Sequence, residues 1–324
     1  MLVSLTLPNR GALFGVTSLE QLLELAEDAD ASGWFESVWV GDSLLGKPRP
    51  ESLTLLSAIA ARTSSVQLGP ACMASFTLRD PVLLAYQYAT LDVLARGRSV
   101  LVACTGLVDQ PGAQVEARLY ELERRDRVQR LLEWIQILRT LWTTDEASFD
   151  GRHYRFQGVS LEPKPVAGPH PPIWIANNAR GSRELVLRTL RRAVIHGDGW
   201  QTADWYGPED LDWRIRQVRR ELSERGKEPG TFPLSIYHNI NINEDRQEAQ
   251  DESQQFLETY YVPQEFPPET VRNWCALGTP EQCAHHLARI RDMGATEICL
   301  RLTSWDQRGQ YRRLVEEVLP LLRG

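Results

Sequence analysis

The chain has 324 residues, of which 42% are apolar and 24% are charged. This composition is ordinary for a globular protein and excludes disordered and collagen-like chains. Its 43 acidic residues outnumber its 36 basic ones, which gives a formal net charge of -7, and neither sign forms a long block. Such a surface repels a phosphate backbone, so we expect no nucleic-acid partner.

No apolar run approaches the roughly 20 residues that are needed to span a bilayer. The first ten residues also lack the basic start and long apolar core of a signal peptide. We therefore expect a cytoplasmic protein with no membrane partner. The five cysteines are odd in number and form no CxxC pair, and the six histidines show no metal-binding spacing. This pattern favours free thiols and predicts no metal site.

In the first part of the chain, short β-rich runs alternate with amphipathic helical stretches. Strands are predicted, in chain order, at residues 2–7, 37–40, 66–72 and 99–103. Ser18 and Gln21 have the spacing of a capping box, and Gly33 is placed to end the first helix. Asp80-Pro81 predicts the start of the third helix, and one long charged helix is predicted over about residues 116–140.

The second part of the chain continues the same alternation after an inserted hairpin. The hairpin is predicted within residues 147–156, with its turn at Asp150-Gly151, inside an insertion of about residues 143–172. Further strands are predicted at residues 173–176, 197–201, 234–242 and 297–301. Eight βα units with no linker between them predict an α/β fold, a single (β/α)8 TIM barrel domain over residues 1–324. Residues 8–12 lack the glycine-rich turn that a dinucleotide-binding open sheet needs.

The segment Gly41-Asp-Ser-Leu-Leu-Gly-Lys47 has the spacing of a phosphate-binding P-loop. That motif also needs Ser or Thr after the lysine and a helix that begins there. Here Pro48 follows the lysine and Pro50 comes two residues later, so the loop cannot continue into a helix. We therefore exclude a nucleoside triphosphatase.

In a TIM barrel, catalytic groups lie at the carboxyl ends of the strands and in the loops after them. This rule selects Asp42-Ser43, Cys72-Met73, Cys104-Thr105-Gly106, Asn177-Asn178, Gly199-Trp200 and His238-Asn239. Cys72 and Cys104 end consecutive strands, so they either face one pocket or simply pack in the core. His238 is either an acid or base or a hydrogen-bonded structural residue.

The loop at residues 177–182 leads from the fifth predicted strand into a helix. Its backbone N–H groups, the Ser182 hydroxyl and Arg180 could together hold a phosphate at the helix N-terminus. Ser182 could equally be an ordinary N-cap. The residues alone leave both interpretations open.

With these strand ends in place, the chain resembles the luciferase-like flavin-dependent oxidoreductases, a family of FMN-dependent monooxygenases and coenzyme F420-dependent enzymes. The matching stretches are residues 37–43, 49–63, 66–69, 78–81, 89–98, 149–154, 171–176 and 197–200. The resemblance is weak after about residue 202, where only residues 277–280 continue it.

The resemblance implies that the ring of a flavin or deazaflavin rests on the end of the third strand. Many members have a non-proline cis peptide there, which by position would be Ala71-Cys72. Further site residues are implied in the same way. Asp42 and Ser43 would border the ring, Cys104 would lie near it, and the phosphate end would be held by Asn177, Asn178, Arg180, Gly181 and Ser182.

Two departures bear on the reaction. Members that use F420 commonly have histidine after the strand-two aspartate, and often a glutamate at the end of strand four. Here those places hold Ser43 and Cys104-Thr105. The candidate catalytic residues are therefore Ser43, Cys104 and His238, and either His238 or a tyrosine would supply a proton that the reaction needs.

A reduced-FMN monooxygenase needs less acid–base chemistry from the protein, because the reduced flavin itself reacts with dioxygen. The sequence therefore predicts an FMN-dependent monooxygenase of a small organic molecule, with a flavin reductase as the source of reduced flavin. An F420-dependent reductase or dehydrogenase is the alternative. A non-catalytic flavin-binding barrel or oxygenase partner subunit is a second one. Relatives are often homodimers, and no charged cluster in the sequence indicates a carboxylate or phosphate on the substrate.

Overall fold

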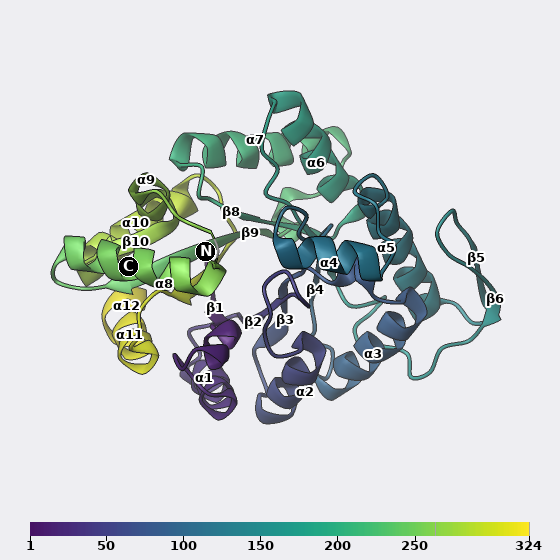
Figure 1. Ribbon diagram of the computed structural model, residues 1–324, viewed down its shortest axis with the longest axis horizontal. Helices are drawn as coiled ribbons and strands as arrows, with labels where there is room; N and C mark the ends of the chain where they lie inside the picture. Colours follow the sequence, from purple (N-terminus) through teal and green to yellow (C-terminus); the bar gives the residue numbers. More distant parts are fainter. Residues whose placement is uncertain (263, 324) are drawn as a thin grey trace.

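The computed structural model describes residues 1–262 and 264–323, in which eight parallel strands close into a barrel with helices on the outside (Figure 1). Around the barrel these strands are β1 (Leu2–Leu7), β2 (Ser37–Asp42), β3 (Gln67–Met73), β4 (Leu101–Ala103), β7 (Ile173–Ala176), β8 (Gly199–Ala203), β9 (Leu234–Ile242) and β11 (Glu297–Leu302). The pairings of β11 with β1 and of β8 with β9 close the ring. The predicted TIM barrel is confirmed.

The helices begin and end largely where the sequence predicts. The Ser18 hydroxyl and the Gln21 side chain form the capping box of α1, and Gly33 ends that helix at φ 65°. Asp80 caps α3 by accepting a hydrogen bond from the N–H of Leu83. The helices that cover the barrel are α1 (Leu19–Ser32), α2 (Ser52–Arg62), α3 (Pro81–Leu94), α4 (Pro111–Leu119), α5 (Arg127–Thr143), α6 (Arg183–His196), α7 (Pro208–Glu224), α8 (Arg246–Tyr261), α9 (Pro268–Trp274), α10 (Pro280–Asp292), α11 (Gln307–Arg313) and α12 (Leu319–Arg323).

The prediction of one long helix over residues 116–140 is wrong. The chain forms α4 and α5 instead, with a turn between them in which Glu121 takes a positive φ of 47°. The break lets each helix bind a different loop of the barrel. Glu116 of α4 accepts hydrogen bonds from the loop after β2, whereas Arg127 of α5 donates to the carbonyl of Thr105 after β4 (3.0 Å). Charge periodicity alone could not reveal this division.

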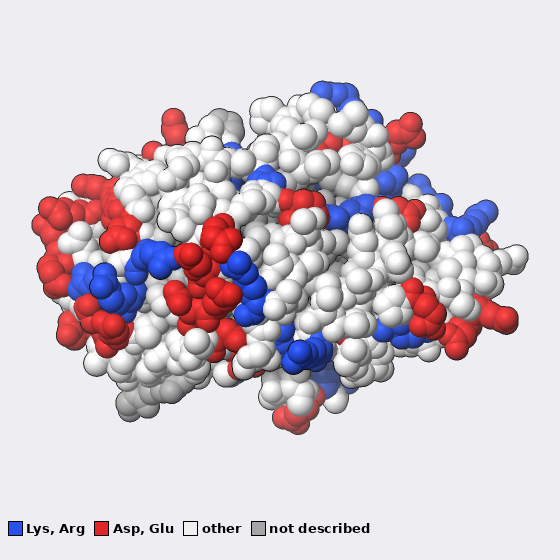
Figure 2. Space-filling model, turned by 90° about the horizontal axis from the view of Figure 1, so that it is seen from below, with Lys and Arg blue, Asp and Glu red and all other residues white. Residues whose placement is uncertain are grey.

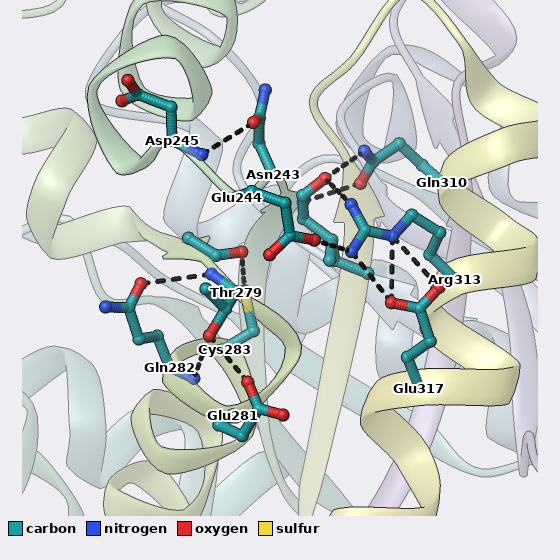
Figure 3. Close-up of polar contacts among 12 residues, drawn as sticks. Asn243, Glu244, Asp245, Thr279, Glu281, Gln282, Cys283, Gln310, Arg313 and Glu317 are labelled. Carbon is teal, nitrogen blue, oxygen red and sulfur yellow. Dashed lines mark hydrogen bonds and ion pairs between the residues drawn. The ribbon is translucent and has the colours of Figure 1, made fainter.

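A short strand, β10 (Cys275–Gly278), was missed at the sequence level. It pairs with residues 239–242 of β9, beyond the residues that pair with β8. Figure 3 shows the contacts that fix this region: Thr279 caps α10, and Arg313 of α11 donates to the carbonyl of Ile242 (3.1 Å) and to Glu244. Residues 275–278 contain no β-branched or aromatic side chain, so they lack the strand signal that β7, a strand of the same length, carries in the sequence.

The predicted hairpin is confirmed as β5 (Ala147–Asp150) and β6 (Arg155–Val159), and it lies outside the ring of helices (Figure 1). The Glu133 carboxylate of α5 accepts hydrogen bonds from the N–H groups of Arg152 and His153 in the turn. An open hollow of about 610 Å³ lies between the hairpin and α3, away from the strand ends. It therefore does not belong to the barrel mouth.

The barrel interior is filled by side chains rather than hollow. Trp39 and Trp174 lie against each other with ring centroids 5.4 Å apart. Beneath them the buried Glu297 carboxylate accepts hydrogen bonds from Ser37 (2.9 Å) and Trp39 (3.3 Å), and burial raises its pKa. This packed layer forms the floor of the barrel mouth.

The outer surface of the molecule carries both signs of charge. In the view of Figure 2, acidic and basic side chains are interspersed over the visible face. None of the described helices is long and apolar enough to cross a membrane.

Candidate active site

A cavity of about 180 Å³ opens at the carboxyl ends of the strands, where a TIM barrel places its chemistry. An adjoining hollow of about 350 Å³ shares Asp42, Ser43 and Arg49 with it. The two together extend from the barrel axis toward α3. The cavity is lined by Thr6, Gly41, Asp42, Ser43, Lys47, Arg49, Ala71, Cys72, Ala74, Leu107, Ala176, Asn178, Gln201, Thr202, Ala203, Trp205, Tyr237, Tyr260, Tyr261 and Trp274.

The end of β3 forms one wall of this cavity. The peptide bond between Ala71 and Cys72 is cis, as predicted, and both residues line the cavity. Upstream, a Cβ atom on Gly69 would lie 1.9 Å from the carbonyl oxygen of Val100. Glycine is therefore required at that position for β3 to approach the residues that lead into β4.

Asp42 joins the end of β2 to the loop that follows β3. Its carboxylate accepts hydrogen bonds from the Ser52 hydroxyl and from the N–H of Ser75, both at 2.7 Å. Arg79 lies 3.4 Å from the same carboxylate. Asp42 thus lines the cavity and also joins the end of β2 to the loop that follows β3.

Ser43 and Glu116 hold the loop that resembles a P-loop. The Ser43 hydroxyl accepts a hydrogen bond from the N–H of Lys47 (2.8 Å), and Glu116 accepts from Leu45 and from Gly46 (2.9 Å). The N–H groups that a P-loop would turn toward phosphate are therefore bound to side chains of the protein. The loop presents a lysine to the cavity instead.

Lys47 is a candidate functional residue that the sequence analysis missed. Its side chain is 8% exposed, lines the cavity, and places Nζ 4.1 Å from the centre of the Tyr261 ring. Burial and the nearby charges of Arg49, Arg10 and Arg301 lower its pKa to about 7. A lysine of this pKa exchanges a proton readily near neutral pH.

The two cysteines that end β3 and β4 do meet. The Cys72 thiol lies 2.9 Å from the Sγ of Cys104, which in turn donates to the carbonyl of Met73 (3.5 Å). Contact with Cys72, together with burial, raises the pKa of Cys104 well above its usual value. Cys104 is therefore a neutral thiol near pH 7 and a weak nucleophile. Of the pair, Cys72 lines the cavity.

His238 lies inside β9 but is not among the lining residues. Its ring is fully buried, its Nδ1 lies 2.7 Å from Asp204 Oδ1, and it packs on His286 with ring centroids 4.8 Å apart. His238 thus has the hydrogen-bonded structural role, which was one of the two roles that its position in the sequence left open. The geometry brings Lys47, rather than His238, into the cavity.

His286, which packs against His238, gives a testable pH dependence of stability. Burial, with the neighbouring His238, lowers the pKa of His286 to about 3. The unfolded chain therefore binds one more proton than the folded protein between about pH 6.5 and pH 3. This group alone makes the free energy of unfolding fall on acidification by up to about 1.4 kcal/mol for each pH unit, a slope that is reached in the middle of that window.

In urea unfolding, the free energy of unfolding of the His286→Leu variant should change less with pH than that of the wild type, and the difference in slope should be the amount given above for each pH unit. His285→Leu is the matched control, because His285 is the exposed neighbour on the same helix. Equal slopes in wild type and His286→Leu would contradict the buried neutral imidazole.

The loop at residues 177–182 borders the cavity at the end of β7. The side-chain oxygen of Asn178 accepts hydrogen bonds from Thr202 (3.0 Å) and from the N–H of Ala203 (2.8 Å). Ser182 caps α6 by accepting from the N–H of Leu185. The ordinary N-cap is thus present, and Gly181 lies beside it with a positive φ of 116°.

The side chains of two other predicted residues of this loop contact neighbouring elements of the barrel. The guanidinium of Arg180 is exposed and lies over the ring of Trp205, with 4.6 Å from Cζ to the ring centroid. The Asn177 side chain turns toward Thr189 of α6 (3.4 Å). Of the predicted cofactor residues, Asp42, Ala71, Cys72 and Asn178 line the cavity, whereas Asn177, Arg180, Gly181 and Ser182 are not among its lining residues.

Comparison with known proteins places this geometry in a family. Residues 1–297 match the family model described as luciferase-like monooxygenase. The chain belongs to the luciferase-like family. The predicted family and the predicted enzyme class, an oxidoreductase, are confirmed.

Among the relatives of this luciferase-like protein is a protein from Kineococcus radiotolerans named F420-dependent glucose-6-phosphate dehydrogenase. The two are 25% identical over 326 aligned positions, which cover 94% of this chain and 93% of the relative. A relative of the same name from Mycolicibacterium gilvum is 26% identical over 94% of both chains.

Solved structures show the same fold at lower sequence identity. An F420-dependent secondary alcohol dehydrogenase in complex with an F420-acetone adduct superposes with a TM-score of 0.83 and 18% identity, and covers 100% of this chain and 99% of that one. A monooxygenase from Streptomyces bottropensis gives a TM-score of 0.79 and 21% identity, with 99% of both chains covered. The fold is therefore shared by enzymes of both kinds.

Proposed function

We propose that this luciferase-like oxidoreductase depends on coenzyme F420 and acts as a reductase or dehydrogenase of a small organic molecule. The observation that carries the proposal is the cavity beside Ala71 and Cys72, which holds Lys47 as a proton-exchanging group. Two relatives that are named F420-dependent align with almost the whole chain, which supports the same cofactor. The FMN-dependent monooxygenase that the sequence favoured is thus the second candidate.

The residues of the cavity fit a flat ring with a phosphate tail. Ala71 and Cys72 carry small side chains, and Tyr237, Trp205 and Trp274 supply aromatic surface around the same space. Asn178 lines the cavity, and the exposed Arg180 of the same loop lies over Trp205, which also lines it. We assign Ala71 and Cys72 to the ring and the loop at residues 177–182 to the phosphate.

The bound deazaflavin would accept or supply a hydride, and the protein must then move the accompanying proton. Lys47 Nζ is suited to that task, since its pKa of about 7 lets it take up or release a proton at neutral pH. Ser43 holds the backbone of Lys47 in place. The serine that replaces the expected histidine would thus position a different acid–base group.

The second candidate rests on the likeness to a monooxygenase structure with a TM-score of 0.79. In that case the same wall would hold FMN, and a separate flavin reductase would supply its reduced form. The cavity would then chiefly shield the site from water.

Turnover assays separate the two candidates. The protein is incubated with F420 and a panel of alcohols, and with reduced F420 and the matching ketones and aldehydes, while the visible absorbance of the deazaflavin is followed. A parallel reaction contains reduced FMN, the same panel and an oxygen electrode. Substrate-dependent change in F420 absorbance supports the proposal. Substrate oxygenation with reduced FMN, and no reaction with F420, would contradict it.

Arg180 gives a prediction for the phosphate end. Replacing this stacked guanidinium by alanine should weaken F420 binding about tenfold, which corresponds to about 1.4 kcal/mol. The difference should shrink at high salt, because the site is exposed. Fluorescence titration of F420 at two salt concentrations measures it, with the exposed Arg188→Ala of α6 as the control. Unchanged affinity in Arg180→Ala would remove this residue from the site.

A further inference from the structure

Four basic side chains gather at one side of the cavity without an acidic partner. Lys47 and Arg49 line it, whereas Arg10 and Arg301 lie close enough behind to lower the pKa of Lys47. Among the described residues, no carboxylate lies within 4.0 Å of a charged nitrogen of any of the four. Asp42, the acidic residue of the lining, is already bound by Ser52, Ser75 and Arg79.

Arg301 is the most deeply placed of the four. Its guanidinium is fully buried and donates to the side-chain oxygen of Asn239 (2.8 and 3.0 Å) and to the Tyr261 hydroxyl (2.8 Å). Its charge is stabilised by aromatic faces rather than by a carboxylate: the rings of Tyr237, Tyr260, Tyr261 and Trp274 lie 4.6 to 5.5 Å from its Cζ. Arg301 therefore keeps a full positive charge behind the two cations that line the cavity, Lys47 and Arg49.

The strand and loop are shaped to hold Arg49 at the cavity. A Cβ atom on Gly41 would lie 1.7 Å from Arg49 Nη1, so the glycine leaves room for the guanidinium against β2. The Nε atom of Arg49 donates to the carbonyl of Lys47 (3.1 Å), which ties the two cations to one loop. No described residue accepts a hydrogen bond from Lys47 Nζ.

We propose that the substrate carries a compact anionic group, a carboxylate or a phosphate ester, which binds against Lys47 and Arg49. This assignment rests on the proposed function, since it takes the cavity to be the substrate site of an F420-dependent enzyme. The anion would supply the negative charge beside Lys47 and Arg49 that no carboxylate of the described residues provides. It would also favour the protonated form of Lys47, so that anion binding and proton uptake are coupled.

The phosphate of the cofactor is the competing source of such a charge. We place that phosphate at the loop of residues 177–182, on the β7 side of the cavity, whereas Lys47 and Arg49 follow β2. The anion of the substrate and that of the cofactor should therefore bind together.

Calorimetric titration with sulfate tests the proposal on free and on F420-loaded protein. Sulfate keeps one charge state between pH 6.5 and pH 8.5, so a change in its affinity reports the protein. The groups that face Lys47 are Arg10, Arg49, Cys72, Tyr261 and Arg301. The arginines stay charged throughout that range. We expect sulfate to bind both forms, at least tenfold more weakly at pH 8.5 than at pH 6.5.

Two variants and a matched control decide which residues hold the anion. Lys47→Met and Arg49→Met should each weaken sulfate binding at least tenfold at pH 6.5, and Lys47→Met should also remove the pH dependence. Lys164→Met makes the same change at another of the three lysines, outside the cavity, and should alter neither property. If Lys47→Met does not fold, Arg49→Met and the wild-type pH profile decide the question.

Each contrary outcome has a distinct meaning. Absence of sulfate binding, or binding that neither variant weakens, overturns the anion site. Sulfate that binds free protein and is displaced by F420 assigns the cations to the cofactor and overturns the substrate class. Failure of F420 to bind, with sulfate binding intact, defeats the proposed cofactor and leaves the anion site in place.

Discussion

Replacing Ala71 by phenylalanine should weaken F420 binding at least 100-fold, which corresponds to about 2.7 kcal/mol. Ala71 lines a cavity of only about 180 Å³, so a phenyl ring on it would occupy the space that we assign to the deazaflavin. The barrel should still fold, because the new side chain enters a cavity rather than the packed layer beneath it. Fluorescence titration with F420 measures the loss.

Ala61→Phe is the matched control for this experiment, since Ala61 is exposed on α2. It should bind F420 as the wild type does. Thermal unfolding of both variants separates a blocked cavity from an unfolded chain. Wild-type affinity in folded Ala71→Phe would show that the ring binds elsewhere.

Replacing Gly69 by valine should lower the free energy of unfolding by about 3 kcal/mol or more. A Cβ atom there would lie 1.9 Å from the Val100 carbonyl oxygen and 2.9 Å from Cζ3 of Trp39. One of these contacts is backbone and the other belongs to a buried tryptophan, so neither can move away easily. The strain would separate the end of β3 from its neighbours.

Urea unfolding measures this cost, and Gly230→Ala is the control because a Cβ on Gly230 would meet nothing closer than 3.8 Å. Loss of F420 binding should accompany the loss of stability in Gly69→Val. A variant as stable as the wild type would contradict the close approach of β3 to residue 100.

The sequence predicted the barrel because each of its eight strands is a short β-rich run that is followed by a helical stretch. Ser18, Gly33 and Asp80 are local signals, and they act in the structure as they do in the sequence. The division of the chain into α4 and α5 escaped this approach. It depends on Glu116 and Arg127, which bind loops distant in the sequence.

The same limit explains which part of the site was found. Asp42, Ser43 and Cys72 end strands, so the barrel rule located them in the cavity. In the sequence, Lys47 belongs to a segment that cannot form a P-loop, and Arg301 ends the last predicted strand, so neither position by itself indicates a site. The sequence shows no charged cluster, because the four cations at the cavity are separated along the chain and come together only when the barrel closes. They are Arg10, Lys47, Arg49 and Arg301.

The cofactor is tested most directly by titrating the protein with F420 and with FMN side by side and following the fluorescence of each. F420 should bind at micromolar concentration or tighter, should be excluded by Ala71→Phe, and should bind more tightly than FMN. Tight FMN binding at the same wall without F420 binding would favour the monooxygenase. Binding of neither cofactor would contradict the assignment of the β3 wall as a redox site.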